Sequence, residues 1–439
     1  VKNNTGKLNN TTISINNISF KIDEDIFSGK ASVNNIIANP KINAQFKGVL
    51  NLGKINQAYP VNLQTKLSGI LKADLQTSFD MNAIKNKAID RIENNGKINL
   101  TNFNFSSDTM LNPIKIKETE VDFKPSIIAL TKFNATTGKS DLNANGTLKN
   151  LLGAMFTGQK LQGNLNLKSN ALYLNDFMQK SSEQTTEKEV EKETNTVKAT
   201  SLKIPAFLDC KVVADANTVY YDNLKLKNVK GVFLLKNQKA ILQDVNVNVF
   251  NGLISLNGEI NTQNKQPNFA LKLGVKSFDI SESFTGLELL QSLSPIIGAM
   301  NGKLNSDIDL SGNLDTDFTP NLASLSGKAF AELLTTKIDP KKTKSLSLLN
   351  DKLSFINLEK IDLSDIKTHL SFDNGNVVVK PFDVKYKDIG INIGGSHGFD
   401  KNMNYNITFN VPAKYLGNDV KGLLSKLSAK EQDITVPIT

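Results

Sequence analysis

Residues 244–261 read DVNVNVFNGLISLNGEIN, and the pattern of this stretch decides the fold. Valine alternates with asparagine, so every second side chain is apolar, as expected of a strand with one buried face. An Asn-Gly pair follows at Asn251. Such pairs favour tight hairpin turns because both residues tolerate a positive φ. The stretch therefore predicts antiparallel strands that are joined by short turns.

The same alternation recurs along the chain, for example at 164–168 and 404–411. Asn-Gly pairs accompany it, and each predicts a hairpin turn. They begin at Asn95, Asn145, Asn251, Asn257, Asn301 and Asn374. We therefore expect a mostly β protein built as an elongated antiparallel sheet.

Short helices are expected to punctuate the strands. Asp80 is a good N-cap for a helix whose apolar side carries Met81, Ile84, Ala88 and Ile92. Further short helices are predicted at 287–293, around 346–353 and at 420–427. Their apolar residues recur at helical spacing, which favours packing against the edge of a sheet.

Composition limits the classes of function. The chain has 439 residues, 39% of them hydrophobic, and a net charge of +9. The lysines are scattered singly along alternating segments and are not clustered with aromatic residues, so we expect solvated strand faces and no nucleic-acid partner. Alternatively, this positive charge gives the protein a weak attraction for anionic membrane surfaces. The apolar runs are much shorter than the roughly 18 to 20 residues of a membrane span.

A polar segment divides the chain into two similar parts. Residues 180–200 read KSSEQTTEKEVEKETNTVKAT, too polar to bury a core, and predict a disordered linker or long loop at 179–200. We expect a first β-repeat at 1–178 and a second at 201–439, related by tandem duplication. The matching anchors are Gly29 with Gly252, Pro40 with Pro267, Gly69 with Gly302, Gly96 with Gly327, and Gly138 and Gly146 with Gly390 and Gly398. The last pairs require an insertion in the second copy, for which 341–363 is the expected place.

Catalytic and metal-binding patterns are nearly absent from the sequence. There is one cysteine, Cys210, and there are two histidines, His369 in a strand-like stretch and His397 in a Gly-rich segment that predicts a turn. These three residues are too few for a zinc site of the usual spacing without carboxylates. Asp307 and Asp309, like Asp315 and Asp317, alternate along strands and do not follow the spacing of a calcium loop. We therefore expect no enzyme, no metal and no cofactor.

Residues 201–280 resemble the C-terminal region of AsmA-like proteins. The similarity lies in a strand ending in LKNVKG, a Phe-Asn-Gly turn at Phe250 and a strand led by Pro267. It continues at NGKL (301–304), SGK (326–328) and PFDV (381–384). It covers most of 201–439 and, through the duplication, more weakly 11–178. The linker at 180–200 and the missing N-terminal anchor depart from the family pattern.

The resemblance implies a periplasmic protein of a Gram-negative-type bacterium, folded as a repeating β-groove and linked to phospholipid traffic and outer-membrane biogenesis. It also implies an inner-membrane anchor, and a protein partner in the periplasm or at the outer membrane. Val1 is not an initiator Met, and no signal peptide follows it. We accordingly expect the chain to be an internal fragment, with the anchor upstream.

The apolar face of the expected sheet must be covered, and two hypotheses explain how. In the first, the sheet curls into an open hydrophobic groove that shelters phospholipid acyl chains. In the second, two sheets form a dry sandwich, as in a structural or adhesive array without a ligand. The residues expected to line the groove are Val245, Val247, Val249, Phe269, Leu271, Leu273, Val275, Leu165 and Leu167.

Overall fold

The structure is a computed structural model that describes most of the chain in two compact units. The described residues are 1–54, 68–86, 88, 91–106, 111–124, 127–151, 153–154, 158–177, 179–180, 199–200, 203–287, 291, 297–315, 318–352, 356–399, 402–412, 415 and 433–438. The first unit comprises residues 1–222 and 228–241, and the second comprises 223–227 and 242–439. The repeats predicted at 1–178 and 201–439 thus differ in their bounds from the compact units.

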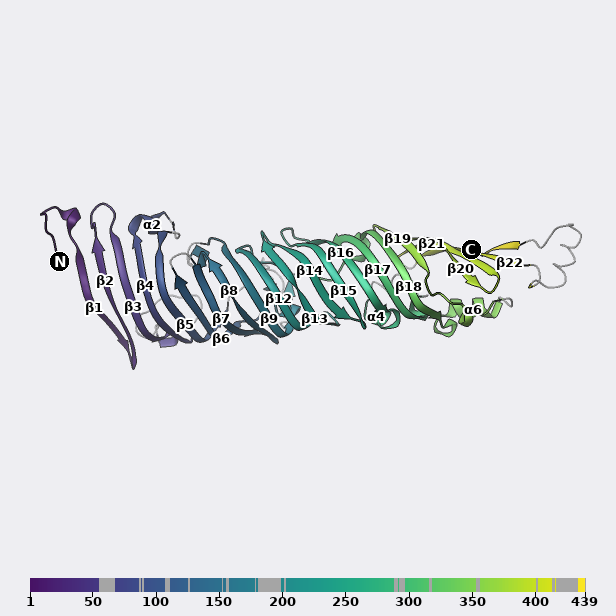
Figure 1. The fold of residues 1–439 in the computed structure, drawn as a ribbon, viewed down its shortest axis with the longest axis horizontal. Helices are drawn as coiled ribbons and strands as arrows, with labels where there is room; N and C mark the ends of the chain where they lie inside the picture. The colour runs from purple at the N-terminus through teal and green to yellow at the C-terminus, as the bar shows by residue number, and fades with distance from the viewer. Residues whose placement is uncertain are drawn as a thin grey trace, which may run out of the picture. The chain divides into compact units, whose positions relative to one another are not determined.

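Antiparallel strands dominate the first unit (Figure 1). Its strands are β1 (Ile13–Ile22), β2 (Asp25–Asn34), β3 (Lys41–Asn51), β4 (Ile70–Asp80), β5 (Glu93–Phe105), β6 (Ile114–Lys124), β7 (Ile127–Thr137), β8 (Ser140–Lys149), β9 (Leu161–Tyr173) and β12 (Leu208–Tyr221). From β1 to β9 each strand pairs antiparallel with the next. Among the described strands β1 pairs only with β2, so this sheet has an open edge.

The second unit repeats this arrangement. Its strands are β15 (Gly252–Asn261), β16 (Asn268–Asp279), β17 (Met300–Asn313), β18 (Ser326–Ile338), β19 (Lys367–Asp373), β20 (Asn376–Tyr386), β21 (Ile389–Gly398), β22 (Met403–Pro412) and β23 (Asp433–Ile438), while β13 (Leu224–Lys236) and β14 (Lys239–Val249) contribute to both units. From β15 to β23 each strand pairs antiparallel with the next. The predicted fold class, a mostly β chain with an open antiparallel sheet and few short helices, is confirmed.

Helices are short and lie between strands. The α-helices are α2 (Met81–Lys85), α4 (Ile280–Gly286) and α6 (Lys344–Lys352), and the 3-10 helices are η1 (Leu8–Asn10), η2 (Leu52–Lys54), η4 (Leu174–Phe177), η5 (Ile297–Ala299), η6 (Leu322–Ser324), η7 (Pro340–Lys342) and η8 (Leu358–Lys360). Helix α6 confirms the helix expected around 346–353. The helices predicted at 287–293 and 420–427 fall largely or wholly outside the described residues. No helix of the described part is long and apolar enough to cross a membrane.

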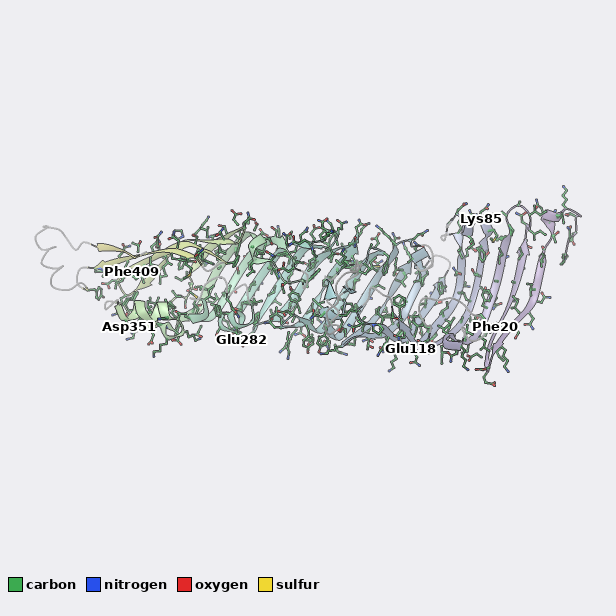
Figure 2. All side chains as sticks on the ribbon, turned by 180° about the vertical axis from the view of Figure 1, so that it is seen from behind. Phe20, Lys85, Glu118, Glu282, Asp351 and Phe409 are labelled. Atoms are coloured by element: carbon green, nitrogen blue, oxygen red, sulfur yellow. The ribbon has the colours of Figure 1, made fainter. Side chains whose placement is uncertain are left out.

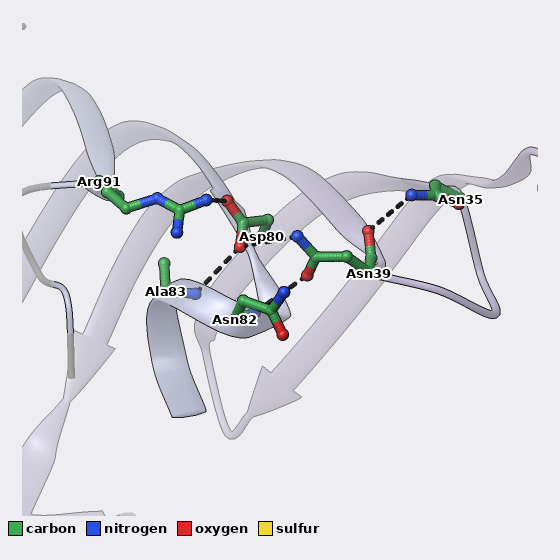
Figure 3. Close-up of polar contacts among 6 residues, drawn as sticks. All are labelled: Asn35, Asn39, Asp80, Asn82, Ala83 and Arg91. Carbon is green, nitrogen blue, oxygen red and sulfur yellow. Dashed lines mark hydrogen bonds and ion pairs between the residues drawn. The ribbon is translucent and has the colours of Figure 1, made fainter. Parts of the chain in front are cut away.

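Asp80 ends β4 and caps α2, as predicted (Figure 3). Its carboxylate accepts hydrogen bonds of 3.0 Å from the side-chain amide of Asn39 and from the backbone N–H of Ala83, and it pairs with Arg91. The hydrogen bond from Asn39, the bond from Ala83 and the charge of Arg91 together lower the pKa of Asp80. The helix itself is shorter than predicted, because it ends at Lys85 and not near Ile92.

Four of the six Asn-Gly pairs lie inside strands, so the prediction that each makes a hairpin turn was wrong for those beginning at Asn95, Asn145, Asn257 and Asn301. The pairs at Asn251 and Asn374 do fall in the turns that follow β14 and β19. Gly96 shows the physical reason. Its φ is +132°, and a Cβ there would lie 2.1 Å from the backbone oxygen of Asp74 on the neighbouring strand. Close approach of two strands, and not chain reversal, requires glycine at this position.

Bulges interrupt several strands where a polar residue has a positive φ. These residues are Asn102 in β5, Asn228 in β13, Asp244 in β14 and Ser277 in β16. In β16 the register shifts between Val275 and Phe278, and both side chains are buried although two exposed residues separate them. Each bulge therefore keeps apolar residues on one face. Bulges also bend a strand and increase its twist, which favours a curled sheet over a flat one.

Strand order in the two units supports the predicted duplication. In the first unit Gly29 lies in β2 and Gly96 in β5. In the second unit Gly252 lies in β15 and Gly327 in β18. The two anchors are therefore three strands apart in both units. Gly327 also repeats the geometry of Gly96, with a φ of +154° and a Cβ site 2.1 Å from a backbone oxygen of the preceding strand, here that of Asp309. Gly29 lies inside β2 whereas Gly252 begins β15, so this anchor does not match residue for residue. Superposition of the two units remains the test of the duplication.

The predicted insertion carries η7, α6 and η8, between β18 and β19. It packs on the last strands of the second unit and forms a closed apolar core with them. The buried members of this core are Ala299, Leu346, Ile356, Leu358, Ile361, Leu363, Ile366, Val384, Tyr386, Ile389, Ile391, Phe409 and Val411. At β20 to β22, therefore, helical segments cover the apolar face of the sheet.

The connection between β9 and β12 differs from the others because these strands are parallel neighbours. A parallel pair cannot be joined by a hairpin and needs a crossover that returns along the strand. Residues 174–207 supply it, and within them β10 (Gln179–Lys180) pairs with β11 (Ala199–Thr200). The predicted linker at 179–200 falls in this connection, with 181–198 outside the described residues.

Deleting residues 183–197 is expected to change the free energy of unfolding by less than about 1 kcal/mol, because each doubling of loop length costs about 0.6 kcal/mol. The 13 residues of β9 span about 43 Å at roughly 3.3 Å per residue. The remaining residues 174–182 and 198–207 are long enough to return over this distance. Thermal melting of the deletion variant tests the expectation. A large drop in the melting temperature would show that the deleted segment is packed.

Candidate functional site

The apolar face of β14 and β16 in the second unit carries seven of the predicted groove residues. Val245, Val247 and Val249 alternate with more exposed asparagines and are 3, 5 and 8% exposed. On β16, Phe269 and Val275 are buried, while Leu271 and Leu273 are half-buried. The intervening β15 pairs Leu256 with Leu273 and Ile254 with Val275. The predicted residues thus alternate as expected, although five of the seven are too buried to lie on an open surface.

The opposite face of these strands is polar. Asn246 of β14 accepts a hydrogen bond of 2.9 Å from the hydroxyl of Ser255 in β15. Exposed lysines on neighbouring strands pair with acidic residues, as in Lys328 with Asp309 at 3.8 Å and Lys367 with Glu332 at 3.1 Å. The sheet therefore has an apolar face and a polar face, and cross-strand ion pairs balance part of the lysine charge.

In the first unit the apolar face is more open. Leu165 and Leu167 of β9 are half-buried. Leu165 lies between Gly146 of β8 and Val212 of β12, and Leu167 lies between Ala144 of β8 and Ala214 of β12. Along β2 to β4 the face carries large apolar residues such as Phe27, Phe46 and Leu75, all half-buried. Among the described residues no second sheet packs over these strands, and α2 contacts β4, the strand that it follows. The side chains are partly shielded by their neighbours in the sheet and remain accessible from one side.

Exposed apolar side chains gather on the open edge strand. Phe20 of β1 (Figure 2) is 48% exposed, and Ile13, Ile15 and Ile18 on the same strand are also exposed. Large apolar residues gathered on one strand are unusual for a soluble surface and mark interaction sites. The first unit thus presents apolar side chains to whatever lies against this face, whereas the second unit buries most of its own.

His397 lies in β21, and the predicted turn is wrong. The residue is 4% exposed, and its Nδ1 is 2.9 Å from the hydroxyl oxygen of Tyr405 in the adjacent β22. Nε2 has no hydrogen-bond partner among the described residues. Burial lowers the pKa of His397 and raises that of Tyr405 to about 12. The pair is therefore neutral near pH 7.

Acid is expected to destabilise the second unit through His397. The unfolded side chain has a pKa of about 6.5, whereas the folded one has a lower pKa, so the unfolded state binds more protons below that pH. Stability should fall by up to about 1.4 kcal/mol per pH unit between pH 6.5 and the folded pKa. Melting curves of the wild type and His397→Phe between pH 7.5 and 5 measure this. Equal acid sensitivity of the two proteins would contradict the assignment.

The other sequence candidates for chemistry, Cys210 and His369, belong to different units. Cys210 is buried in β12, where its thiol donates to the backbone oxygen of Leu161 at 3.2 Å and burial raises its pKa. The ring of His369 in β19 lies 5.2 Å from that of Phe330 in β18, which confirms its strand position. The described residues hold no group of three or more potential metal ligands.

Comparison with family models, with curated proteins and with solved structures finds no match for this chain. The resemblance to AsmA-like proteins therefore rests on the sequence pattern and remains a prediction.

Proposed function

We propose that this protein binds lipid without catalysing a reaction, and that the apolar face of its curled sheet shelters phospholipid acyl chains. The observation that supports this most is the half-buried face of the first unit, which no second layer covers among the described residues. Half-buried aromatic and aliphatic side chains such as Phe46 and Leu167 offer contacts that water cannot satisfy. Burying an acyl chain contributes about 0.8 kcal/mol per methylene, so such a face holds lipid without a catalytic group.

The cellular role follows from the AsmA-like resemblance at 201–280. We place the protein in the periplasm of a Gram-negative-type bacterium, held at the inner membrane by an anchor. There it carries phospholipid between the two membranes and contributes to outer-membrane biogenesis, together with a periplasmic or outer-membrane protein partner. An open apolar sheet face is compatible with this transfer role, because lipids can slide along it without crossing a barrier.

A dry structural or adhesive array is the second candidate, and the second unit favours it. There Val245 and Val247 are nearly inaccessible, and the insertion between β18 and β19 completes a closed core. Both are typical of a sandwich interior that needs no ligand. The two candidates therefore differ mainly in what covers the apolar face of the first unit.

Lipid extraction from the purified chain tests the proposal. The protein is expressed with export to the periplasm of a Gram-negative host, purified without detergent, and analysed by native mass spectrometry and by extraction into organic solvent. We expect phospholipid to accompany the folded protein. A chain that melts cooperatively, carries no lipid, and takes up no short-chain phospholipid when it is offered would favour the structural array.

A further inference from the structure

A cleft of about 770 Å³ lies at the ends of β13 to β16, beside α4, and all of its lining belongs to the second unit. The lining residues come from the start of β13, the turn between β14 and β15, the end of β16, and α4. Three are lysines: Lys225 and Lys227 from β13, and Lys276 from β16. The amides of Asn223, Asn248 and Asn251 and the hydroxyl of Ser277 lie among them.

The charge of this cleft is not balanced. Lys225, Lys227 and Lys276 form no ion pair within the described part of the chain, in contrast to Lys328 and Lys367 on other strands of the same unit. The one acidic residue of the lining is Glu282 of α4 (Figure 2), whose carboxylate accepts a 2.8 Å hydrogen bond from the Asn251 amide. Three lysines against one glutamate leave a net charge of +2 in the lining. Like charges that line one cleft attract an anion.

One side of the cleft is apolar. Val249, at the end of the apolar face, and Phe250, in the turn that follows, contribute to the lining together with Leu224 and Leu253. The ring of Phe250 packs edge-on against that of Phe278 with 5.2 Å between the centroids, which fixes this side of the cleft. The cleft thus joins the polar face, with its lysines, to the end of the apolar face.

We propose that this cleft binds the phosphate of an anionic amphiphile, with the lysine ammonium groups and the asparagine amides on the phosphate oxygens and the apolar part against Phe250 and Leu253. Ammonium groups and amide N–H groups are the donors that phosphate oxygens accept from. The assignment rests on the proposed lipid-binding function and deepens it, because it adds a headgroup site to a surface for acyl chains. The ligand class is a phosphate ester that carries acyl chains.

The test compares binding of three soluble probes by titration calorimetry: dihexanoyl phosphatidic acid, glycerol phosphate and dihexanoyl glycerol. The variant is the full chain with Lys225→Gln, Lys227→Gln and Lys276→Gln. Its matched control carries Lys272→Gln, Lys303→Gln and Lys385→Gln, which are also exposed lysines of the second unit. All six positions are exposed, so both triple variants are expected to fold.

We expect the cleft variant to bind dihexanoyl phosphatidic acid at least about tenfold more weakly than the control, a factor equal to about 1.4 kcal/mol. Binding of dihexanoyl glycerol should be equal in the two proteins, because that probe has no phosphate. Equal affinity of both variants for phosphatidic acid overturns the phosphate site and leaves the proposed lipid function standing. If neither acyl probe binds the wild type, the lipid function fails. In that case, weaker binding of glycerol phosphate by the cleft variant than by the control variant still supports an anion site. Equal binding of glycerol phosphate by the two variants overturns the anion site as well.

Discussion

Glutamate at position 167 is expected to abolish lipid binding by the first unit and to leave its thermal melting nearly unchanged. Leu167 is half-buried on the apolar face of β9, with no layer above it among the described residues. In the lipid-free protein, water reaches the new carboxylate from the open side, so the cost of burying a charge does not arise in full. With acyl chains on the face, the same carboxylate would be buried without a partner. We expect the loss of co-purifying phospholipid, with a change in the melting temperature of only a few degrees.

The matched control is Asn164→Glu, which places the same charge on the same strand at an exposed position of the polar face. It should retain lipid. Leu273→Glu repeats the test at the half-buried position of β16 in the second unit. The lipid hypothesis fails if Leu167→Glu collapses the melt while Asn164→Glu does not, since that outcome identifies a dry core at β9.

Aspartate at Val247 is expected to unfold the second unit. Val247 is 5% exposed on β14, between the equally buried Val245 and Val249. A carboxylate there has no partner and costs several kcal/mol, a large part of the roughly 5–15 kcal/mol that stabilises a typical domain. The expected result is loss of the second unit's transition in thermal or urea melts. The substitution therefore does not separate a groove from a sandwich, because both hypotheses give the same result at so buried a position.

Asn248→Asp is the control for this prediction, because its side chain is exposed on the opposite face of the same strand. Val247→Ala separates charge from volume. Loss of two methyl groups from a packed site is expected to cost about 1–3 kcal/mol and to leave a folded protein. A folded Val247→Asp variant with an unshifted melt would mean that β14 is far less packed than the structure shows.

Alternation and caps were the parts of the fold that the sequence predicted well. The alternating residues of β9, β14 and β22 became strands with one apolar face, because period-2 patterning depends only on neighbouring side chains. Asp80 capped its helix for the same local reason. The insertion at 341–363 was expected from spacing alone, and it brought the residues that close the core of the second unit.

Features that depend on the neighbouring strand were predicted poorly. Asn-Gly at Asn95 looks like a turn in the sequence, yet Gly96 is needed where the backbone of β4 approaches closely. His397 lies in a Gly-rich segment that predicts a turn, but it pairs with Tyr405 across the sheet. The parallel pairing of β9 with β12 is equally nonlocal.

The sequence carries a signal for the bulges. Before each of Val229, Val245 and Phe278 the alternation skips one place, with two polar residues in a row and the second in the left-handed conformation. The candidate groove residues were placed on the correct strands, but their degree of burial depends on the covering elements, and alternation does not reveal these. The sequence does not predict the lysine cleft, because Lys225 and Lys276 lie far apart in the chain and line one cleft only in the folded sheet.

The parallel pair of β9 and β12 has a consequence for a chain that has been cut. Twelve residue pairs join β9, which precedes residues 181–198 in the chain, to β12, which follows them. A protease site engineered into that segment would break the covalent connection without removing any of the ladder hydrogen bonds between the strands. The two fragments should then migrate together on a sizing column under native conditions and separate only in denaturant. Such a chain could be handled as a two-polypeptide protein, with a different label on each fragment.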